Sequence, residues 1–274
     1  MRKYIYIICA MAMAVSCAQK PIVIVQIADA QLGFDAAVKG DRPGAEYVND
    51  LTFEVECLKA AVAKVNELKP DMVVFTGDQV HLPCDNEQWD AFMQGIADID
   101  PSVELYHIPG NHDHVVKDGI ADPAEFISRF GSDRFAVKKG NVNVVGINTS
   151  LIYFDSALEQ DQMVWLEETL ENTKESEVTL IFGHHPFFCE NIDEDDGHVQ
   201  IQKSKRLHYF QYFKSKGVDA VFAGHLHDNS TGEYEGIPML TATSSGYQLG
   251  SAAASIRVIT IADGQMSEEL VPIR

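Results

Sequence analysis

Five short polar blocks interrupt this chain, and each one follows a run of apolar residues. The runs, of which Ile22–Ala28 is the first, are rich in Val and Ile, a composition typical of buried strands. In α/β sheets, ligands bind just beyond the carboxyl ends of the strands. The blocks therefore predict one shared site at one edge of a sheet. They are Asp29-Ala30-Gln31, Gly77-Asp78, Gly110-Asn111-His112-Asp113, Gly183-His184-His185-Pro186 and Gly224-His225-Leu226-His227.

Between the blocks, apolar strands alternate with amphipathic helices, and this alternation predicts an α/β fold. The 274 residues contain no internal repeat, which suits one large domain. After His227 the pattern changes to strands and turns, from Gly232 to Val271. Further strands are predicted at Met72–Thr76, Leu105–Ile108, Val142–Ile147, Val178–Phe182 and Val218–Ala223. Helices are predicted at Phe53–Leu68, Glu87–Asp98, Pro123–Phe130, Gln160–Asn172 and Lys203–Lys216.

The first residues have the composition of an export signal. Arg2 and Lys3 precede the apolar run Tyr4–Val15, which is shorter than the roughly 20 residues that span a bilayer. The small residues directly before Cys17 resemble a bacterial lipobox. We therefore expect residues 1–20 to be a signal peptide with a lipobox and residues 21–274 to be the functional domain. The expected location is the cell envelope, on the periplasmic side, with a lipid anchor at Cys17. An ordinary signal peptide cut nearby is the alternative.

The formal net charge of −20 limits the partners that this chain can bind. A surface this acidic repels nucleic acid and anionic lipid headgroups, so we expect no nucleic acid partner and membrane contact only through the anchor. It does not exclude phosphorylated substrates, because bound metal ions invert the charge at a site.

The polar blocks supply the donors of a metal site. Carboxylate, amide oxygen and imidazole suit Zn, Mn and Fe. A carboxylate that bridges two metals holds them about 3.5–4 Å apart. We expect the glycines of the blocks to let the backbone turn sharply, so that short side chains face the site.

The five blocks, in this order, resemble the calcineurin-like metallophosphoesterase superfamily over nearly the whole predicted domain. The resemblance implies an αββα sandwich, with two mixed sheets flanked by helices. The segments Ile27–Gly33, Glu190–Asp196 and Gln248–Gly250 resemble one branch in particular, that of the calcineurin-like phosphoesterase-domain-containing protein one, a serine/threonine phosphatase.

This resemblance implies two divalent metal ions, Mn, Fe or Zn, and in-line attack on phosphorus by a hydroxide between them. The first metal would take Asp29, Gln31, Asp78 and His227, with Gln31 where most of the superfamily has His. The second would take Asp78 again, with Asn111, His184 and His225. His112 would bind a phosphoryl oxygen or protonate the leaving group. Asp113 would accept a hydrogen bond from His112.

Other polar residues near the blocks are weaker candidates. Asn111, besides its metal role, and His81 are candidate substrate-binding residues, and the bland alternative, a histidine in a loop on the rim, is favoured for His81. His185 is expected to point away from the metals, and other histidines, including His114, to fill the core or the surface. The acidic run Asp193–Asp196 is expected to be a solvated loop rather than a third metal site. Several aromatic residues are candidates for a substrate groove: Tyr153, Phe154, Phe187, Phe188 and Tyr247.

Three functions remain in competition. The first is a metal-dependent phosphomonoesterase acting on phosphoprotein or on a small phosphorylated molecule. The second is a phosphodiesterase or pyrophosphatase acting on nucleotides or lipid headgroups, because one metal core supports all of these reactions. The third is a non-catalytic metal-binding module. It is disfavoured because decayed members of the superfamily usually lose ligands or the catalytic histidine, whereas His112 and every ligand except the exchanged Gln31 are present.

Overall fold

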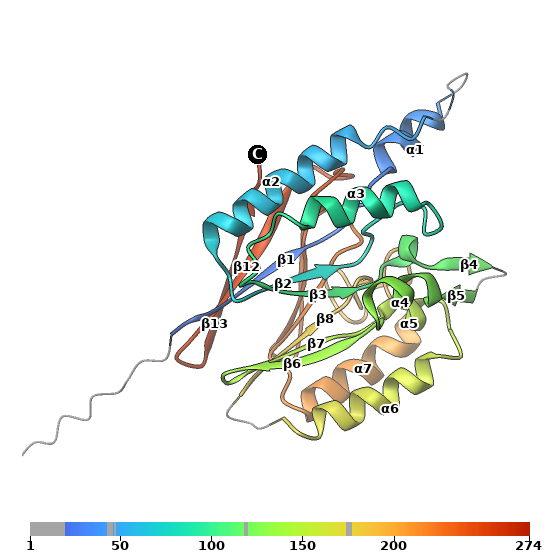
Figure 1. Cartoon of the computed structure of the whole chain (residues 1–274). Coiled ribbons are helices and arrows are strands. Elements are labelled where there is room, and N and C mark those ends of the chain that lie inside the picture. Colours follow the sequence, from blue (N-terminus) through green and yellow to red (C-terminus); the bar gives the residue numbers. More distant parts are fainter. Residues whose placement is uncertain (1–19, 43–45, 47, 118–119, 174–176) are drawn as a thin grey trace, which may run out of the picture.

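Two mixed β-sheets lie face to face, with helices on both outer surfaces, in a computed structural model of the chain (Figure 1). The model describes residues 20–42, 46, 48–117, 120–173 and 177–274. Cys17 and almost all of the predicted signal segment therefore lie outside the described residues. Among the described residues, none of the helices is both long and apolar enough to cross a membrane.

The first sheet has the order β13-β12-β1-β2-β3. Strands β1, β2 and β3 are parallel to one another, and β12 runs antiparallel between β1 and β13. Both β1 and β2 are strands of the buried, nearly continuous apolar kind that the sequence predicts. The strands are β1 (Ile22–Ile27), β2 (Met72–Thr76), β3 (Glu104–Ile108), β12 (Ser255–Ala262) and β13 (Gln265–Pro272).

The second sheet has the order β10-β11-β9-β8-β7-β6. Its central strands β7, β8, β9 and β11 are parallel, and β6 and β10 are antiparallel edge strands. A separate hairpin is formed by β4 (Val115–Lys117) and β5 (Ile120–Asp122). The strands of the second sheet are β6 (Phe135–Lys139), β7 (Val142–Gly146), β8 (Val178–Phe182), β9 (Ala220–Ala223), β10 (Ser230–Tyr234) and β11 (Ile237–Thr241).

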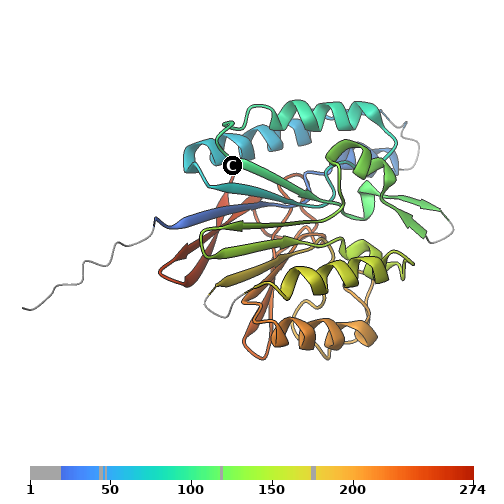
Figure 2. The same ribbon diagram turned by 60° about the horizontal axis from the view of Figure 1, so that its bottom comes forward.

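Three apolar clusters hold the layers together. One lies between the sheets and contains Ile24, Val74, Leu180 and Phe222. The second packs α2 (Thr52–Leu68) and α3 (Asn86–Ile96) on the first sheet, and the third packs α6 (Glu159–Leu170) and α7 (Lys203–Ser215) on the second. Figure 2 shows these helix pairs on opposite sides of the sandwich. The predicted αββα architecture is confirmed.

Several short elements were not predicted. They include the helices α1 (Phe34–Gly40) and α5 (Thr149–Tyr153), whereas α4 (Ala124–Phe130) was expected. Helices of five to seven residues offer too few apolar repeats for a 3.6-residue period to be recognised. Strand β6 alternates half-buried and exposed residues, so it lacks the apolar run that marks the central strands. The predicted strand at Val218–Ala223 begins only at Ala220.

Candidate active site

All five polar blocks meet at the carboxyl ends of parallel strands, as the sequence predicts. Asp29, Asp78 and Asn111 follow β1, β2 and β3 of the first sheet, and His184 and His225 follow β8 and β9 of the second. The two sheets therefore contribute to one site from both sides of the sandwich. Asp29, Asp78 and His184 are at most 2% exposed, whereas Asn111 and His225 are half-buried.

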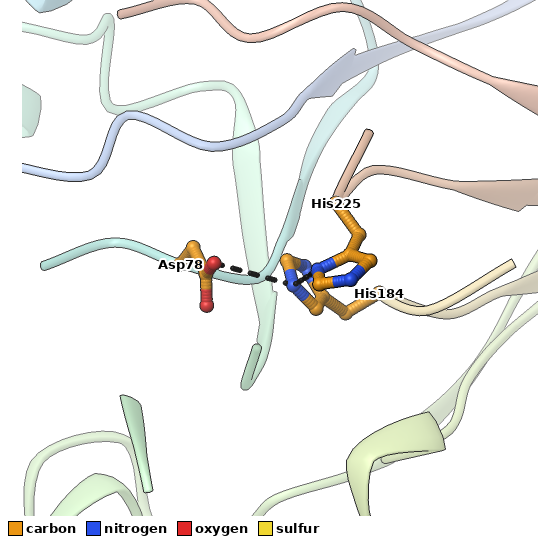
Figure 3. A group of neighbouring side chains, drawn as sticks. All are labelled: Asp78, His184 and His225. Atoms are coloured by element: carbon orange, nitrogen blue, oxygen red, sulfur yellow. Dashed lines mark hydrogen bonds and ion pairs between the residues drawn. The ribbon is translucent and has the colours of Figure 1, made fainter. Parts of the chain in front are cut away.

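One group of donors converges on the Nε2 atom of His184. We call this group the His184 cluster, and its members are Asp78, Asn111, His184 and His225. The Nε2 atom of His184 lies 3.1 Å from Asn111 Oδ1, 3.1 Å from His225 Nδ1 and 3.3 Å from Asp78 Oδ2. Figure 3 shows Asp78, His184 and His225 pointing toward one another. The other ring nitrogen of His184, Nδ1, lies 2.9 Å from the carbonyl oxygen of Thr76. A carbonyl only accepts, so this contact places a proton on Nδ1 and makes Nε2 the ring atom that would face a bound cation.

The second group, which we call the Asp29 cluster, comprises Asp29, Gln31 and His227. Asp29 Oδ1 lies 3.5 Å from His227 Nε2, and His227 Nδ1 is hydrogen-bonded to the carbonyl oxygen of Tyr247. The side-chain oxygen of Gln31 is buried and has no hydrogen-bond partner among the described residues. The backbone N–H of His225 donates to both carboxylate oxygens of Asp29, at 3.1 and 3.0 Å, and so joins the two clusters.

Burial and mutual charge shift the pKa values of these groups in opposite directions. Burial raises the pKa of Asp29 to about 6, although His227 and His184 pull it down. Burial also acts to raise the pKa of Asp78, but the neighbouring histidines His184 and His112 outweigh it and hold that pKa well below its usual range. For His184, burial is opposed by Asp78, and the pKa rises to about 9. The Asp78 carboxylate thus stays ionised although it is buried, and it is available to a cation.

The backbone is left-handed at most of the donor residues, a conformation that L-residues other than Gly rarely adopt. Such strain persists only where the surrounding structure enforces it, and it gathers at functional sites. The φ angles are 51° at Asp29, 37° at Gln31, 49° at Asp78, 71° at His225 and 50° at His227.

The glycines of the blocks mainly allow close approach, which corrects the expectation that each provides a sharp turn. Gly77 is left-handed, with φ of +87°, but Gly110 and Gly224 are not. A Cβ atom on Gly110 would lie 2.1 Å from Asp78 Oδ1, and one on Gly224 would lie 2.4 Å from Asp29 Oδ2. Each of these glycines therefore leaves room for a donor from another block.

His112 is positioned beside the His184 cluster, but Asp113 does not hold its ring. The backbone N–H of His112 donates to Asp78 Oδ1 at 2.8 Å, and His112 Nδ1 lies 3.0 Å from the carbonyl oxygen of His81. The predicted hydrogen bond from His112 to Asp113 is wrong. The Asp113 carboxylate is already occupied by the backbone N–H groups of Gln79, Val80 and Gly110, at 3.0, 3.3 and 2.8 Å. Asp113 instead fastens the loop after β2 to the loop after β3.

His81 lies at the site and contacts it through its ring as well as its backbone. The rings of His81 and His112 stack, with centroids 4.6 Å apart. Burial, with a contribution from His112, lowers the pKa of His81 to about 4, so its ring is neutral at pH 7. His185 is buried, and its ring packs between the rings of Tyr153 and His225.

The aromatic candidates divide into two groups. Phe187 and Phe188 are fully buried beneath α7 and line no groove, which corrects that expectation. Tyr153, Phe154 and Tyr247 are half-buried near the histidines of the site.

The predicted solvated loop Asp193–Asp196 is held by its own hydrogen bonds. The Glu194 carboxylate accepts from the backbone N–H groups of Cys189, Glu190 and Asn191. The buried guanidinium of Arg206 donates to the carbonyl oxygen of Glu194 and to the Asp196 carboxylate. The carboxylates of Glu194 and Asp196 therefore hold the loop in place.

Sequence reasoning missed a supporting network beneath the site. Thr149 Oγ1 accepts from the backbone N–H groups of both His184 and His185, at 2.8 Å each. His114, which was expected only to fill space, bridges the carbonyl oxygen of Gly110 and the side chain of Asn148. Asn148 and Thr149 follow the predicted strand Val142–Ile147. The strand-end position that identified the donors would therefore have identified them too.

The donor set fits divalent metal ions. The ligand atoms of Asp78, His184 and His225 all lie within 4.8 Å of one another. The amide oxygen of Asn111 and the carboxylate of Asp78 both direct lone pairs at His184 Nε2, which can offer them at most one proton. A bound cation would relieve the repulsion between these acceptors. The unpartnered, buried oxygen of Gln31 is a second acceptor without a donor.

Comparison with known sequences identifies relatives along most of the chain. A model of the calcineurin-like phosphoesterase family matches residues 22–229. The serine/threonine-protein phosphatase CPPED1 of Danio rerio is 32% identical over 261 residues, which cover 90% of this chain and 83% of that protein. The protein of the same name from Homo sapiens is 30% identical over 220 residues, which cover 76% and 70%. A probable glycerophosphodiester phosphodiesterase GpdQ of Arcobacter nitrofigilis is 27% identical over 201 residues, which cover 71% of each chain.

Solved structures support the same architecture. The purple acid phosphatase PPD1 from yellow lupin superposes with a TM-score of 0.69 at 14% identity, over 93% of this chain and 52% of that one. A dimetal phosphatase from Danio rerio gives a TM-score of 0.61 at 18% identity, over 92% and 99%. At these identities the matches bear on the fold alone, and they agree with the two-sheet sandwich.

Proposed function

The chain belongs to the calcineurin-like phosphoesterase family, and we propose that within this family it is a phosphomonoesterase that uses two divalent cations. The observation that carries the monoesterase proposal is the similarity to CPPED1 of Danio rerio, which is named a serine/threonine-protein phosphatase and aligns with 90% of this chain. The phosphodiesterase relative aligns over 71% at lower identity. Diesterase or pyrophosphatase activity is the alternative, since the same donors support both reactions.

We assign the donors to two cation sites. Asp29, Gln31 and His227 would hold the first cation, and Asn111, His184 and His225 the second, with the Asp78 carboxylate shared between them. The mixed oxygen and nitrogen donors suit Mn, Fe or Zn. When bound, such cations supply a nucleophile at neutral pH and neutralise charge on the phosphoryl oxygens. The buried, unpartnered oxygen of Gln31 and the convergence on His184 Nε2 support this assignment.

His112 is the proposed general acid. Its Nδ1 proton is held by the carbonyl oxygen of His81, at 3.0 Å. This contact fixes the ring and leaves Nε2 to bind a phosphoryl oxygen or to protonate the departing alkoxide. Asp113 acts indirectly, because it fixes the loop that carries both Asn111 and His112.

A panel of phosphate monoesters and diesters, assayed with Mn, Fe, Zn and no metal, tests this proposal. We expect monoester turnover that requires a divalent metal and disappears with chelator. Undiminished turnover after exhaustive metal removal, checked by elemental analysis, would contradict the metal mechanism. Faster cleavage of diesters than of monoesters with the same leaving group would favour the alternative.

The sequence also supports a proposal about location. The residues before Cys17 resemble a lipobox, and the predicted domain begins only a few residues later. We propose an envelope lipoprotein whose site faces phosphorylated molecules outside the cytoplasm. Stable anchoring takes more than one acyl chain, at about 0.8 kcal/mol per buried CH₂. Cys17→Ser should move the protein from the membrane fraction to the soluble fraction, and a wild type that is entirely soluble would contradict the anchor.

A further inference from the structure

Aromatic rings extend from the catalytic histidine toward the molecular surface on one side of the site. His81 stacks on His112, and the ring of Phe34 lies 5.4 Å from His81 and 5.3 Å from His227. The ring of Tyr247 lies 5.3 Å from Phe34. We call Phe34, His81 and Tyr247 the aromatic shelf. All three are half-buried, so each keeps part of its surface open.

The shelf is fixed to the Asp29 cluster by hydrogen bonds. The backbone N–H of Phe34 donates to the carbonyl oxygen of Gln31 at 3.0 Å, and the carbonyl oxygen of Tyr247 is bonded to His227 Nδ1. The buried carboxylate of Glu54 accepts from the backbone N–H of Asp35 at 2.6 Å and so ties α1 to α2. Leu249, two residues after Tyr247, is 63% exposed. The shelf thus begins at the proposed general acid and is held in place by its bonds to the Asp29 cluster.

Phe34, like Tyr247, has no stacked partner among the described residues. It meets His81, His227 and Tyr247 at interplanar angles of 52°, 60° and 85°, which are tilted or edge-on contacts. On the opposite side of the site, by contrast, Tyr153 is stacked on His185 at 10° and its hydroxyl donates to the carbonyl oxygen of His198. A flat group lying on Phe34 would make the stacked contact that the fold itself leaves unmade.

We propose that the aromatic shelf makes this enzyme selective for phosphate monoesters whose leaving group is an aromatic ring, such as phosphotyrosine or another aryl phosphate. The inference rests on the proposed monoesterase function. His112 protonates the oxygen of the leaving group in that function, and the shelf continues directly from His112 through His81. We therefore place the group attached to this oxygen over the shelf. An aryl group gains offset-stacked and edge-to-face contacts there, whereas the short alkyl chain of phosphoserine does not.

The test must separate ring contacts from intrinsic reactivity, because aryl oxides are better leaving groups than ordinary alkoxides. We would compare aryl phosphates with fluorinated alkyl phosphates whose parent alcohols have the same pKa as the phenols. With the metal-loaded wild type, kcat/KM for aryl esters should exceed that for matched alkyl esters by about tenfold. Phe34→Leu should reduce this ratio to near one. Phe34→Tyr, which keeps the ring, should preserve it.

A matched control is Phe135→Leu, which removes an equally half-buried ring from edge strand β6, where Phe135 stacks on Tyr106. Its aryl-to-alkyl ratio should equal that of the wild type. If Phe34→Leu does not fold or loses metal, Tyr247→Leu provides the second variant, because the carbonyl group that holds His227 is retained.

The outcomes distinguish the two proposals. If no monoester is hydrolysed with any metal, the proposed function fails. If monoesters are hydrolysed but the wild type shows no aryl preference at equal leaving-group pKa, or if Phe34→Leu keeps the preference, the aromatic shelf proposal alone is overturned. A phosphotyrosine peptide and phenyl phosphate serve as separate arms. Preference for either of them over its matched alkyl ester supports the shelf.

Discussion

The two donor clusters occupy one site but are built differently. In the His184 cluster, three donors lie within 3.1 to 3.3 Å of one imidazole nitrogen. In the Asp29 cluster, the carboxylate and His227 are 3.5 Å apart, and the oxygen of Gln31 contacts no donor among the described residues. The first arrangement is already convergent, whereas the second is open.

The difference follows from how each cluster is supported. In the His184 cluster, Asp78 and His225 have left-handed backbone but Asn111 and His184 do not, and His184 is held by Thr149 and Thr76. All three residues of the Asp29 cluster, by contrast, have left-handed backbone, and loop contacts such as that from Ser244 Oγ to the carbonyl oxygen of Asp29 hold them. We therefore expect the His184 cluster to bind its cation more tightly and the Asp29 cluster to set the metal preference.

The largest effect is expected from Asp78→Asn, which would break both clusters at once. Asp78 is the proposed shared ligand, and its loss removes the charge that both cations need. Metal content should fall at both sites and kcat/KM by about 10³ or more, since bound cations contribute several kcal/mol. Elemental analysis and steady-state kinetics would measure both quantities. Retention of one tightly bound metal would show that Asp78 belongs to a single cluster.

His112→Ala separates chemistry from metal binding. The hydrogen bond from His112 to the His184 cluster comes from its backbone N–H, which alanine retains. The chemical rate should therefore fall by about 10² to 10⁴, the range for a general acid, while metal content stays near normal. If the variant lost metal as Asp78→Asn does, His112 would have to be reassigned as a ligand.

Two glycine variants test whether the clusters are independent. The added Cβ of Gly224→Ala would press on Asp29, and that of Gly110→Ala would press on Asp78. Gly224→Ala should weaken mainly the first cation, by about 10- to 100-fold, as for residues that support ligands. Gly110→Ala should weaken both cations. Calorimetric titrations that show equal losses in the two variants would mean that the clusters respond as one unit.

The donors of both clusters were predictable because each follows a strand of continuous apolar residues, and strand ends share one edge of the sheet. The hydrogen bonds that support these donors were harder to predict from the sequence. The Asp113 side chain was assigned to His112, but three backbone N–H groups satisfy it instead, and such bonds depend on how two loops meet. The bridge made by His114 likewise joins segments distant in sequence. The left-handed angle of Gln31 is imposed by surrounding loops, which no local preference of Gln would indicate.

The smallest and most specific effect concerns Gln31 itself. A Gln offers a metal only its amide oxygen, which is neutral and harder than an imidazole nitrogen. The Asp29 cluster should then bind its cation more loosely than one with His at this position, and tolerate Mn or Mg better relative to Zn. Gln31→His should tighten the first cation and shift its preference toward Zn, with little change at the second.

Two features of the structure favour a ligand role over a loop contact for Gln31. Its oxygen is buried, and no donor among the described residues reaches it. A buried acceptor without a partner costs free energy, which a bound cation would recover. Gln31→Leu, which removes the oxygen at similar size, is the control and should weaken the first cation. Titration of the wild type and both variants with Mn and Zn by calorimetry decides the matter. Equal affinities and an unchanged metal preference in all three proteins would reject Gln31 as a ligand and leave the Asp29 cluster with a carboxylate and one imidazole.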